Sequence, residues 1–257
     1  MPTTELNLVA LPNIPVIQPG DDLPVIILAA LERANLKLTA GDVLIVSSKI
    51  VSKSQNRFVD LREITPSAEA LSLGEKTLKD PRMVEVALRE SVGVSRAAPN
   101  VLIVRHRLGF TSANAGIDQS NTGSLGHDLI LLLPENPDES AEQLARSLEQ
   151  KTGVCPGVVI SDTHGRPFRM GNVNVAIGVS GIPSLLDQRG YHDLFGRELK
   201  ATVTAFADQL AAAAGLLTGE ADEGQPVILA RGLKWPTDAA SGRASDMNRP
   251  QEQDLYR

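Results

Sequence analysis

The chain is 257 residues long and 42% of its residues are apolar, which is enough for one large core or two smaller ones. Acids outnumber bases by 31 to 25, and aromatic residues make up only 3% of the chain. This balance argues against a general nucleic-acid-binding protein, which would carry excess positive charge and aromatic rings for stacking on bases. The single cysteine excludes an internal disulfide and a cysteine zinc cluster.

The first half of the chain is expected to alternate irregularly between strands and helices. Short apolar runs predict strands at residues 6–11, 43–46 and 101–104, and the strand at 43–46 is expected to be buried. Apolar residues at helical spacing, with capping or proline signals, predict helices at 22–34, 66–79 and 81–90, and Asp22 is the expected cap of the first. Residues 110–121 are rich in glycine and polar side chains and are expected to form a loop.

The second half is expected to continue in the same way. Apolar runs predict strands at 127–133, 157–160, 173–179 and 227–230, and the first two are expected to be buried. Helices are predicted at 138–151 and 198–217, and the alanine content of the second suits close packing. The polar residues after Trp235 are expected to be loose or only partly ordered. The irregular order of elements predicts an α/β (α+β) fold with mixed sheets and packed helices.

No signal peptide is visible at the N-terminus, and the apolar runs are too short to span a membrane. We therefore expect a cytoplasmic protein with no membrane association and no nucleic-acid partner. Standard motifs for dinucleotides, phosphate loops and His-Glu-x-x-His zinc sites are absent. The four histidines show no metal-ligand spacing.

A polar stretch, residues 161–171, follows the predicted strand at 157–160. It is expected to form a loop and is the strongest candidate for a functional site. It contains Asp162, Thr163, Arg166 and Arg169. Carboxylates supply the oxygen ligands of divalent metals, and guanidinium groups match phosphates or carboxylates. The stretch therefore predicts a site for a metal–nucleotide complex, with the arginines as candidate clamps for an acidic substrate. The alternative is that the arginines form solvated ion pairs.

Further acids lie at predicted loops, namely Asp118, Glu220, Asp222 and Glu223. Together with Asp162 they could hold Mg²⁺ or Mn²⁺ against a triphosphate, although each acid could instead cap a helix or a turn. Lys49 and Lys53 lie just beyond the predicted strand 43–46, where they could reach a phosphate or serve only as strand-edge charges. The charged and glycine-rich residues 187–199 predict either a binding loop or an ion-paired turn.

Several segments together resemble one family, the coenzyme F420-0:L-glutamate ligases, also called gamma-glutamyl ligases of coenzyme F420. The most distinctive are Asn-Ala-Gly-Ile-Asp-x-Ser-Asn at 114–121 and Asp-Thr-x-Gly-Arg at 162–166. Matching segments also occur, in the family's order, at residues 41–53, 176–178, 196–199 and 227–232. The resemblance covers almost the whole chain up to about Gly232.

The resemblance implies a GTP-dependent ligase that joins L-glutamate to the deazaflavin precursor coenzyme F420-0. Further gamma-linked glutamates can follow, with GDP and phosphate released each time. It also implies the family's unusual α/β fold, an intertwined homodimer, and a ligase domain at 1–235 that could comprise two interwoven subdomains. Residues 236–257 would then be a polar tail, and the chain ends too soon for the C-terminal flavin reductase domain of some longer members.

The resemblance also assigns roles to individual residues. Asp118, Asp162, Thr163 and Glu220 would hold Mg²⁺ or Mn²⁺, with K⁺ as a further candidate, and Lys53 and Asp162 would be the catalytic residues. The residues assigned to GTP are Ile14, Pro15, Val16, Ile17, Ser48, Lys49, Lys53, Asn121, Thr218, Gly219, Glu220, Ala221, Asp222, Glu223, Gly224 and Gln225. No residue is an obvious general base for the incoming amine.

Two other functions stay open at this point. One is a metal- and GTP-dependent amide ligase with a different carboxylate acceptor, because the motifs bear more on the nucleotide than on the acceptor. The other is a non-catalytic GTP-binding regulator, which would bind GTP without releasing phosphate.

Overall fold

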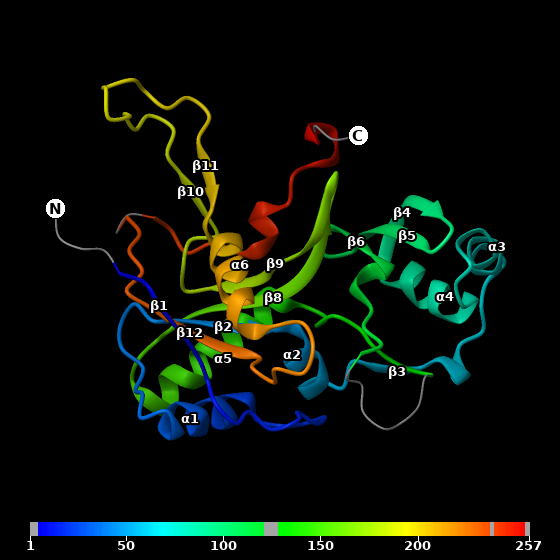
Figure 1. Cartoon of the computed structure of the whole chain (residues 1–257), viewed down its shortest axis with the longest axis horizontal. Helices are drawn as coiled ribbons and strands as arrows, with labels where there is room; N and C mark the ends of the chain where they lie inside the picture. The colour runs from blue at the N-terminus through cyan, green and yellow to red at the C-terminus, as the bar shows by residue number, and fades with distance from the viewer. Residues whose placement is uncertain (1–4, 121–127, 237–238, 255–257) are drawn as a thin grey trace.

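A central five-stranded sheet organises the protein (Figure 1), and the computed structural model describes residues 5–120, 128–236 and 239–254. The strand order is β1-β12-β2-β8-β9, in which β2 and β8 are parallel and the other neighbours are antiparallel. The sheet is therefore mixed, as the sequence predicts. Its strands are β1 (Asn7–Ala10), β2 (Val43–Ser47), β8 (Gly157–Arg166), β9 (Arg169–Ser180) and β12 (Val227–Arg231).

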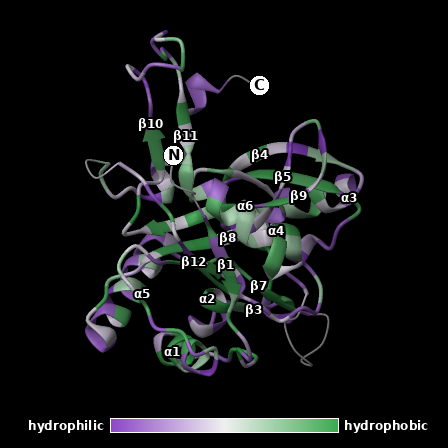
Figure 2. Ribbon diagram, turned by 60° about the vertical axis from the view of Figure 1, so that its left-hand side comes forward, coloured by the Kyte–Doolittle hydropathy of each residue, from purple (hydrophilic) through white to green (hydrophobic). Residues whose placement is uncertain are grey.

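Helices cover both faces of this sheet. Helices α1 (Leu23–Arg33) and α5 (Pro137–Thr152) share one apolar cluster with Leu44 and Val46 of β2. Helix α6 (Phe206–Thr218) shares the other with Val43 and Ile45. Because successive side chains of a strand point to opposite faces, a strand buried on both sides must be apolar throughout. Figure 2 accordingly shows the central strands as largely hydrophobic.

Smaller elements flank the central sheet. Helix α2 (Ser48–Ser54) leads from β2 to a lobe built of β3 (Phe58–Asp60), α3 (Ala68–Thr77), α4 (Pro81–Arg89), β4 (Ser91–Ala98), β5 (Val101–His106), β6 (Thr111–Ala113) and β7 (Leu129–Leu131). Strands β3 and β7 pair with each other, and β4, β5 and β6 form a separate sheet. Short 3₁₀ helices lie at Leu61–Glu63, Asn114–Gly116, Ala244–Met247 and Gln251–Gln253.

A narrow arm projects from the body between β10 (Leu185–Asp187) and β11 (Val203–Ala205), which pair with each other (Figure 1). Leu194 and Phe195 on this arm are each 96% exposed. The arm corrects the predicted helix at 198–217. The helix begins only at Phe206, because residues 203–205 pair with β10 instead.

Residues 161–171 are not the loop that the sequence predicts. Strand β8 continues to Arg166 and returns as β9, so the two strands form a long hairpin whose turn contains Phe168. The polar residues were misleading because this part of the hairpin extends beyond the apolar core, where strand side chains need not be apolar. Helix α2 and strand β4 were not predicted either.

The tail is better ordered than the sequence suggests. Ala244 is buried, and its backbone N–H donates to Asp138 Oδ1 at 2.7 Å. Ser245 Oγ donates to the other oxygen of the same carboxylate. Asp138 lies in the first turn of α5 and also accepts from the N–H of Val179, so it joins the tail to edge strand β9. The loop predicted at 110–121 contains strand β6, which pairs with β5, and the 3₁₀ helix Asn114–Gly116. The other predicted helices and strands are confirmed, including the Asp22 cap of α1.

Gly178 allows β9 to pass very close to the start of α5. A Cβ at this position would lie 2.3 Å from the carbonyl oxygen of Pro137. Replacing Gly178 with alanine is therefore expected to destabilise the protein by about 1–3 kcal/mol, because backbone atoms must move apart. Urea unfolding followed by circular dichroism measures this loss. Gly165→Ala is the control, since its Cβ would approach no atom closer than 4.0 Å. Equal losses in the two variants would contradict the argument.

Candidate nucleotide and metal site around helix α2

Helix α2 begins at the carboxyl end of β2, where polar side chains from distant parts of the chain meet. Because β2 and β8 are parallel neighbours, the carboxyl end of β2 lies beside the middle of β8, and Ser47 is paired with Ser161. The next residue of each segment, Ser48 at the start of α2 and Asp162 on β8, continues this proximity. Ser48 Oγ donates a hydrogen bond to Asp162 Oδ1 at 2.7 Å. Two residues that the sequence assigns to nucleotide and metal are therefore in contact.

Lys49, one residue further along α2, contacts a second predicted metal ligand. Its Nζ lies 2.6 Å from Asp118 Oδ2 and donates to Ser120 Oγ at 3.0 Å. Burial raises the pKa of Asp118, but the hydrogen bonds from Lys49 and Ser120 outweigh burial and hold the pKa below its usual value. Asp118 is therefore a carboxylate at neutral pH, and the ammonium group of Lys49 balances its charge.

Lys53 lies one helical turn beyond Lys49 and is buried, with 7% of its surface exposed. Burial lowers its pKa, the positive charge of Lys49 lowers it further, and Asp118 partly offsets both effects. Residues four apart lie on the same helix face, so α2 presents both ammonium groups toward the same region. A buried cation next to a second cation is well suited to a polyanionic ligand such as a triphosphate.

The other two predicted metal ligands lie on the opposite face of β8. Thr163 Oγ1 donates to Glu220 Oε1 at 3.0 Å, just beyond the end of α6. Because strand side chains alternate, Thr163 points away from the face on which Asp162 lies. The four residues therefore form two groups. Within the described residues, no cluster of three or more His, Cys, Asp or Glu side chains is arranged to hold a metal. The four-residue metal site stays a prediction.

The predicted nucleotide-binding segments flank α2. Ser47 directly precedes α2, and its N–H donates a hydrogen bond to Pro226 O at 2.8 Å. The 218–225 loop therefore ends beside the start of the helix. At the other end, Gly20 N donates to Ser54 O, which places the chain just after residues 14–17 beside the last turn. Val16 in that segment is 74% exposed, whereas Ile17 is buried. Asn121, also predicted to bind the nucleotide, lies outside the described residues.

The 218–225 loop has a defined backbone. Gly219 ends α6 with a φ of +69°, a conformation that favours glycine. Glu223 folds back so that its Oε2 accepts from the N–H of Ala221 at 2.8 Å, and hydrogen bonds to the backbone lower its pKa. The loop is therefore held by its own carboxylate.

The arginines of the β8–β9 hairpin form no solvated ion pairs with acids among the described residues, and their proposed role as substrate clamps stays a prediction. Arg166 and Arg169 pair across the hairpin, and Nη2 of Arg166 donates to the carbonyl oxygens of Met170 and Gly171. Neither arginine forms an ion pair within the described ranges. In residues 187–199, by contrast, Arg189 pairs with Asp187, and Asp193 accepts backbone N–H bonds from Phe195 and Arg197. Of the two interpretations of residues 187–199, a binding loop or an ion-paired turn, this geometry favours the ion-paired turn.

His164 is a neighbour of the site that sequence reasoning missed. Its Nε2 lies 3.2 Å from Asp162 Oδ2, and its ring packs against Phe110, which stacks on His106. Burial lowers the pKa of His106 to about 4, only partly offset by Glu90, so His106 is neutral at physiological pH. Asp162 and His164 are two residues apart, so they share one face of a strand. The sequence would have indicated this if the predicted strand at 157–160 had been continued to Arg166.

Comparison with known proteins extends this description. The model of the F420-0:gamma-glutamyl ligase family matches residues 12–232. The coenzyme F420:L-glutamate ligase of Methanothermobacter thermautotrophicus is 42% identical over 98% of this chain and 99% of its own length. The proteins of the same name from Methanopyrus kandleri and Archaeoglobus fulgidus are 46% and 41% identical, over 94% and 95% of this chain and 93% and 94% of their own lengths.

Proposed function

Since the chain belongs to the F420-0:gamma-glutamyl ligase family and is thus a ligase of F420 glutamylation, we propose that GTP drives its reaction. The substrates are L-glutamate and the carboxylate of coenzyme F420-0, and the products are the amide, GDP and phosphate. Further gamma-linked glutamates follow by the same chemistry. None of the helices in the described ranges combines the length and apolar character needed to cross a bilayer.

The chemistry explains why a nucleotide is required. A carboxylate is a poor electrophile, and an amine does not displace its oxygen in water. Transfer of the γ-phosphoryl group of GTP to the carboxylate gives an acyl phosphate and GDP. The amine of glutamate then attacks the carbonyl carbon, the C–O bond to phosphate breaks, and the amine loses a proton. Phosphoryl transfer depends mainly on positioning and on charge neutralisation rather than on covalent help from the protein.

The observation that carries this proposal is the convergence of charged groups on α2. Ser48 contacts Asp162, Lys49 contacts Asp118, and the ammonium group of Lys53 is buried on the same helix. In the proposed reaction, Lys53 offsets negative charge on the phosphates, and the 218–225 loop and residues 14–17 bind GTP on either side.

Asp118 and Asp162 also fit a divalent cation by their chemistry. Mg²⁺ and Mn²⁺ prefer oxygen ligands, and Mg²⁺ is commonly held by one or two protein carboxylates together with substrate phosphates. The lowered pKa of Asp118 keeps one such carboxylate ionised. When bound, the cation would neutralise phosphate charge. Thr163 and Glu220 are the further proposed ligands, and K⁺ is a further candidate ion.

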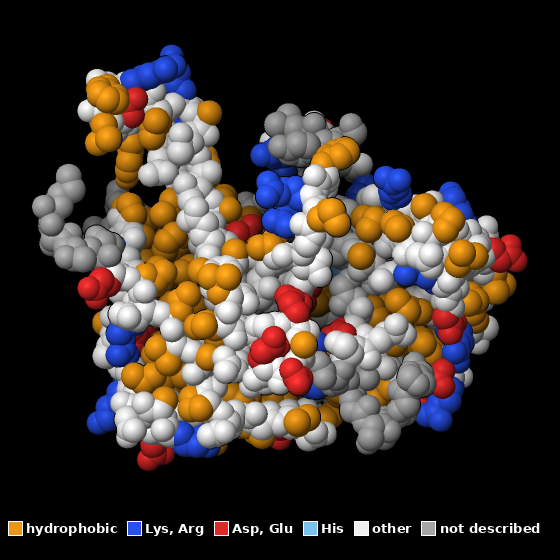
Figure 3. Space-filling view, in the orientation of Figure 1, with side chains coloured by type: hydrophobic (Ala, Val, Ile, Leu, Met, Phe, Trp, Pro, Cys, Tyr) orange, Lys and Arg blue, Asp and Glu red, His pale blue; other side chains and the backbone are white. Residues whose placement is uncertain are grey.

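The family's intertwined homodimer is also part of the proposal. The β10–β11 arm supports it, because Leu194 and Phe195 are almost fully exposed and large apolar side chains are costly to leave in water. Figure 3 shows hydrophobic and basic side chains together at the end of this arm. A second copy of the chain would cover these side chains.

The function is tested by incubating the purified protein with coenzyme F420-0, L-glutamate, GTP and Mg²⁺. Mass spectrometry is expected to detect a product heavier by one glutamyl residue, with one GDP and one phosphate per amide bond. ATP in place of GTP and omission of each substrate are the controls. Product formation with ATP alone, or GDP release that does not depend on glutamate, would contradict the proposal.

A further inference from the structure

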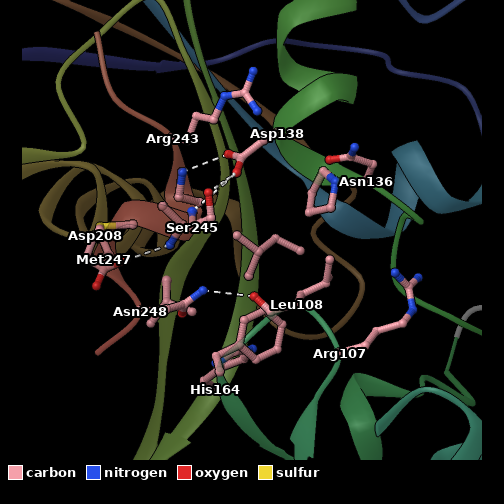
Figure 4. Close-up of a pocket in the computed structure, with 16 residues that line it drawn as sticks. Arg107, Leu108, Asn136, Asp138, His164, Asp208, Arg243, Ser245, Met247 and Asn248 are labelled. Atoms are coloured by element: carbon pink, nitrogen blue, oxygen red, sulfur yellow. Dashed lines mark hydrogen bonds between the residues drawn. The ribbon is translucent and has the colours of Figure 1, made fainter. Parts of the chain in front are cut away.

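A cavity of about 400 Å³ lies at the free edge of β9, apart from every residue that the sequence assigns to GTP or metal (Figure 4). Its walls come from the edge strand, the start of α5, helix α6, residues 107–110 and the tail. His164 is its link to the α2 site, because the ring lines the cavity and Nε2 lies 3.2 Å from Asp162 Oδ2. The cavity is therefore separated from Asp162 by one side chain.

Two arginines line the cavity, of which Arg107 is paired with Glu90, and Asp138 and Asp208 line it as well. Arg107 and the exposed Arg243 both line it, one before α5 in the chain and the other in the tail. Arg107 is held in place, since its Nε donates to Glu90 and its Nη1 donates to the carbonyl oxygen of Glu135 at 2.8 Å. Guanidinium groups recognise carboxylates through paired N–H donors.

A carboxyl group lies among the same lining residues. Asp208 in the first turn of α6 accepts a hydrogen bond from Ala176 N at 2.9 Å through Oδ1. Burial raises its pKa, only partly offset by that hydrogen bond and by His164. The second oxygen of such a carboxyl can accept a hydrogen bond from an amine. Between the charged groups the walls are apolar, with Leu108 and Ile177 among the lining residues.

Guanidinium groups, a carboxyl group and apolar walls together match the parts of a dicarboxylic amino acid. Its carboxylates suit the arginines, its amine suits Asp208, and its methylene groups suit the apolar walls. On this basis, and resting on the proposed function, we propose that the cavity is the binding site for the L-glutamate co-substrate. Entry of the amine from this side would bring it toward Asp162, where the acyl phosphate is to be formed.

The tail completes this site. Ser245 and Asn248 line the cavity, and Asn248 Nδ2 donates to Leu108 O at 2.9 Å. Asp138 holds the tail through Ala244 and Ser245. These tail residues lie beyond the segment 12–232 that the family model matches. The tail therefore supplies part of the amino-acid specificity of this chain, rather than forming a loose extension.

The variants Arg243→Gln and Asp208→Asn test the proposal, with Arg249→Gln as the matched control. Arg249 is also an exposed arginine of the tail, but it does not line the cavity. The KM for L-glutamate is expected to rise at least about tenfold in the first two variants, because a charge-assisted contact is lost. The KM values for GTP and coenzyme F420-0 are expected to remain as in the wild type. Isothermal titration calorimetry with L-glutamate should show the same weakening of binding.

The outcomes separate this inference from the proposed function. If the wild type makes glutamylated product but Arg243→Gln leaves the glutamate KM and the calorimetric affinity unchanged, the cavity assignment is wrong. A rise in the KM for coenzyme F420-0 instead would assign the cavity to the precursor. If the wild type makes no product, the proposed function fails, and calorimetry on wild type and Arg243→Gln still shows whether the cavity binds glutamate. Because Arg243 is exposed, its variant tests the proposal even if Asp208→Asn does not fold.

Discussion

Replacing Asp162 with asparagine is expected to lower GDP release that depends on both substrates by about 10³-fold. The side-chain oxygen of asparagine can still accept the hydrogen bond that Ser48 Oγ donates at 2.7 Å, so the junction of α2 and β8 is retained. The negative charge that is proposed to bind the cation is lost. Steady-state assays of GDP release, with GTP, Mg²⁺, coenzyme F420-0 and L-glutamate all present, measure the effect.

Asp60→Asn is the matched control. Asp60 is also a carboxylate on a strand, the last residue of β3, but it pairs with the exposed Arg62 of the following 3₁₀ helix and is not assigned to the site. The Asp60→Asn variant is expected to release GDP at the wild-type rate. Circular dichroism should show the same fold for both variants. Turnover of Asp162→Asn close to the wild-type rate would remove Asp162 from the catalytic residues and weaken the proposed metal site.

The central sheet could be predicted because its signals are local. Residues 43–46 of β2 are all apolar, as a strand covered on both faces must be, and Asp22 caps α1 through its own side chain. The β8–β9 hairpin and the arm could not be predicted in this way. Their polar strands are stabilised by pairing with a partner strand, so their sequences resemble loops or, for residues 198–205, the start of a helix.

The candidate site depends on contacts between residues far apart in the chain. Ser48 and Asp162 are separated by 114 positions, and Lys49 and Ser120 by 71. Sequence motifs identified these residues, but only the parallel pairing of β2 with β8 explains why the first two meet. The resemblance assigns both Asp162 and Thr163 to metal ions, but it does not show that strand alternation sends them to opposite faces of β8. The cavity could not be predicted, since the tail that closes it is held by Asp138, 106 positions earlier.

The largest expected loss of stability comes from Asp42→Ala. Asp42 is 1% exposed, and its two oxygens accept from Nε and Nη2 of Arg231 at 2.8 and 2.7 Å. It also accepts from Thr39 N, so the carboxylate joins the turn before β2 to the end of β12. Removing it is expected to lower the free energy of unfolding by about 3 kcal/mol. This loss is at the lower end of what is expected when one partner of a buried ion pair is removed, because the Arg231 side chain is 37% exposed and can reach water.

Urea unfolding of Asp42→Ala and of the control Glu142→Ala measures this difference. Glu142 pairs with Arg146 on the surface of α5, and its loss is expected to cost less than about 0.5 kcal/mol.

Burial raises the pKa of Asp42, but the hydrogen bonds from Arg231 and Thr39 outweigh it and hold the pKa below 3.8. A carboxyl group with a lowered folded-state pKa stabilises the fold above its unfolded-state pKa, and that stability is lost as the pH falls through the lowered value. The difference in the free energy of unfolding between wild type and Asp42→Ala should therefore stay constant from neutral pH down to 3.8, the ordinary pKa of an aspartate, and shrink below it. A gap that shrinks already near neutral pH would show that the charge of Asp42 is not what joins the two strands.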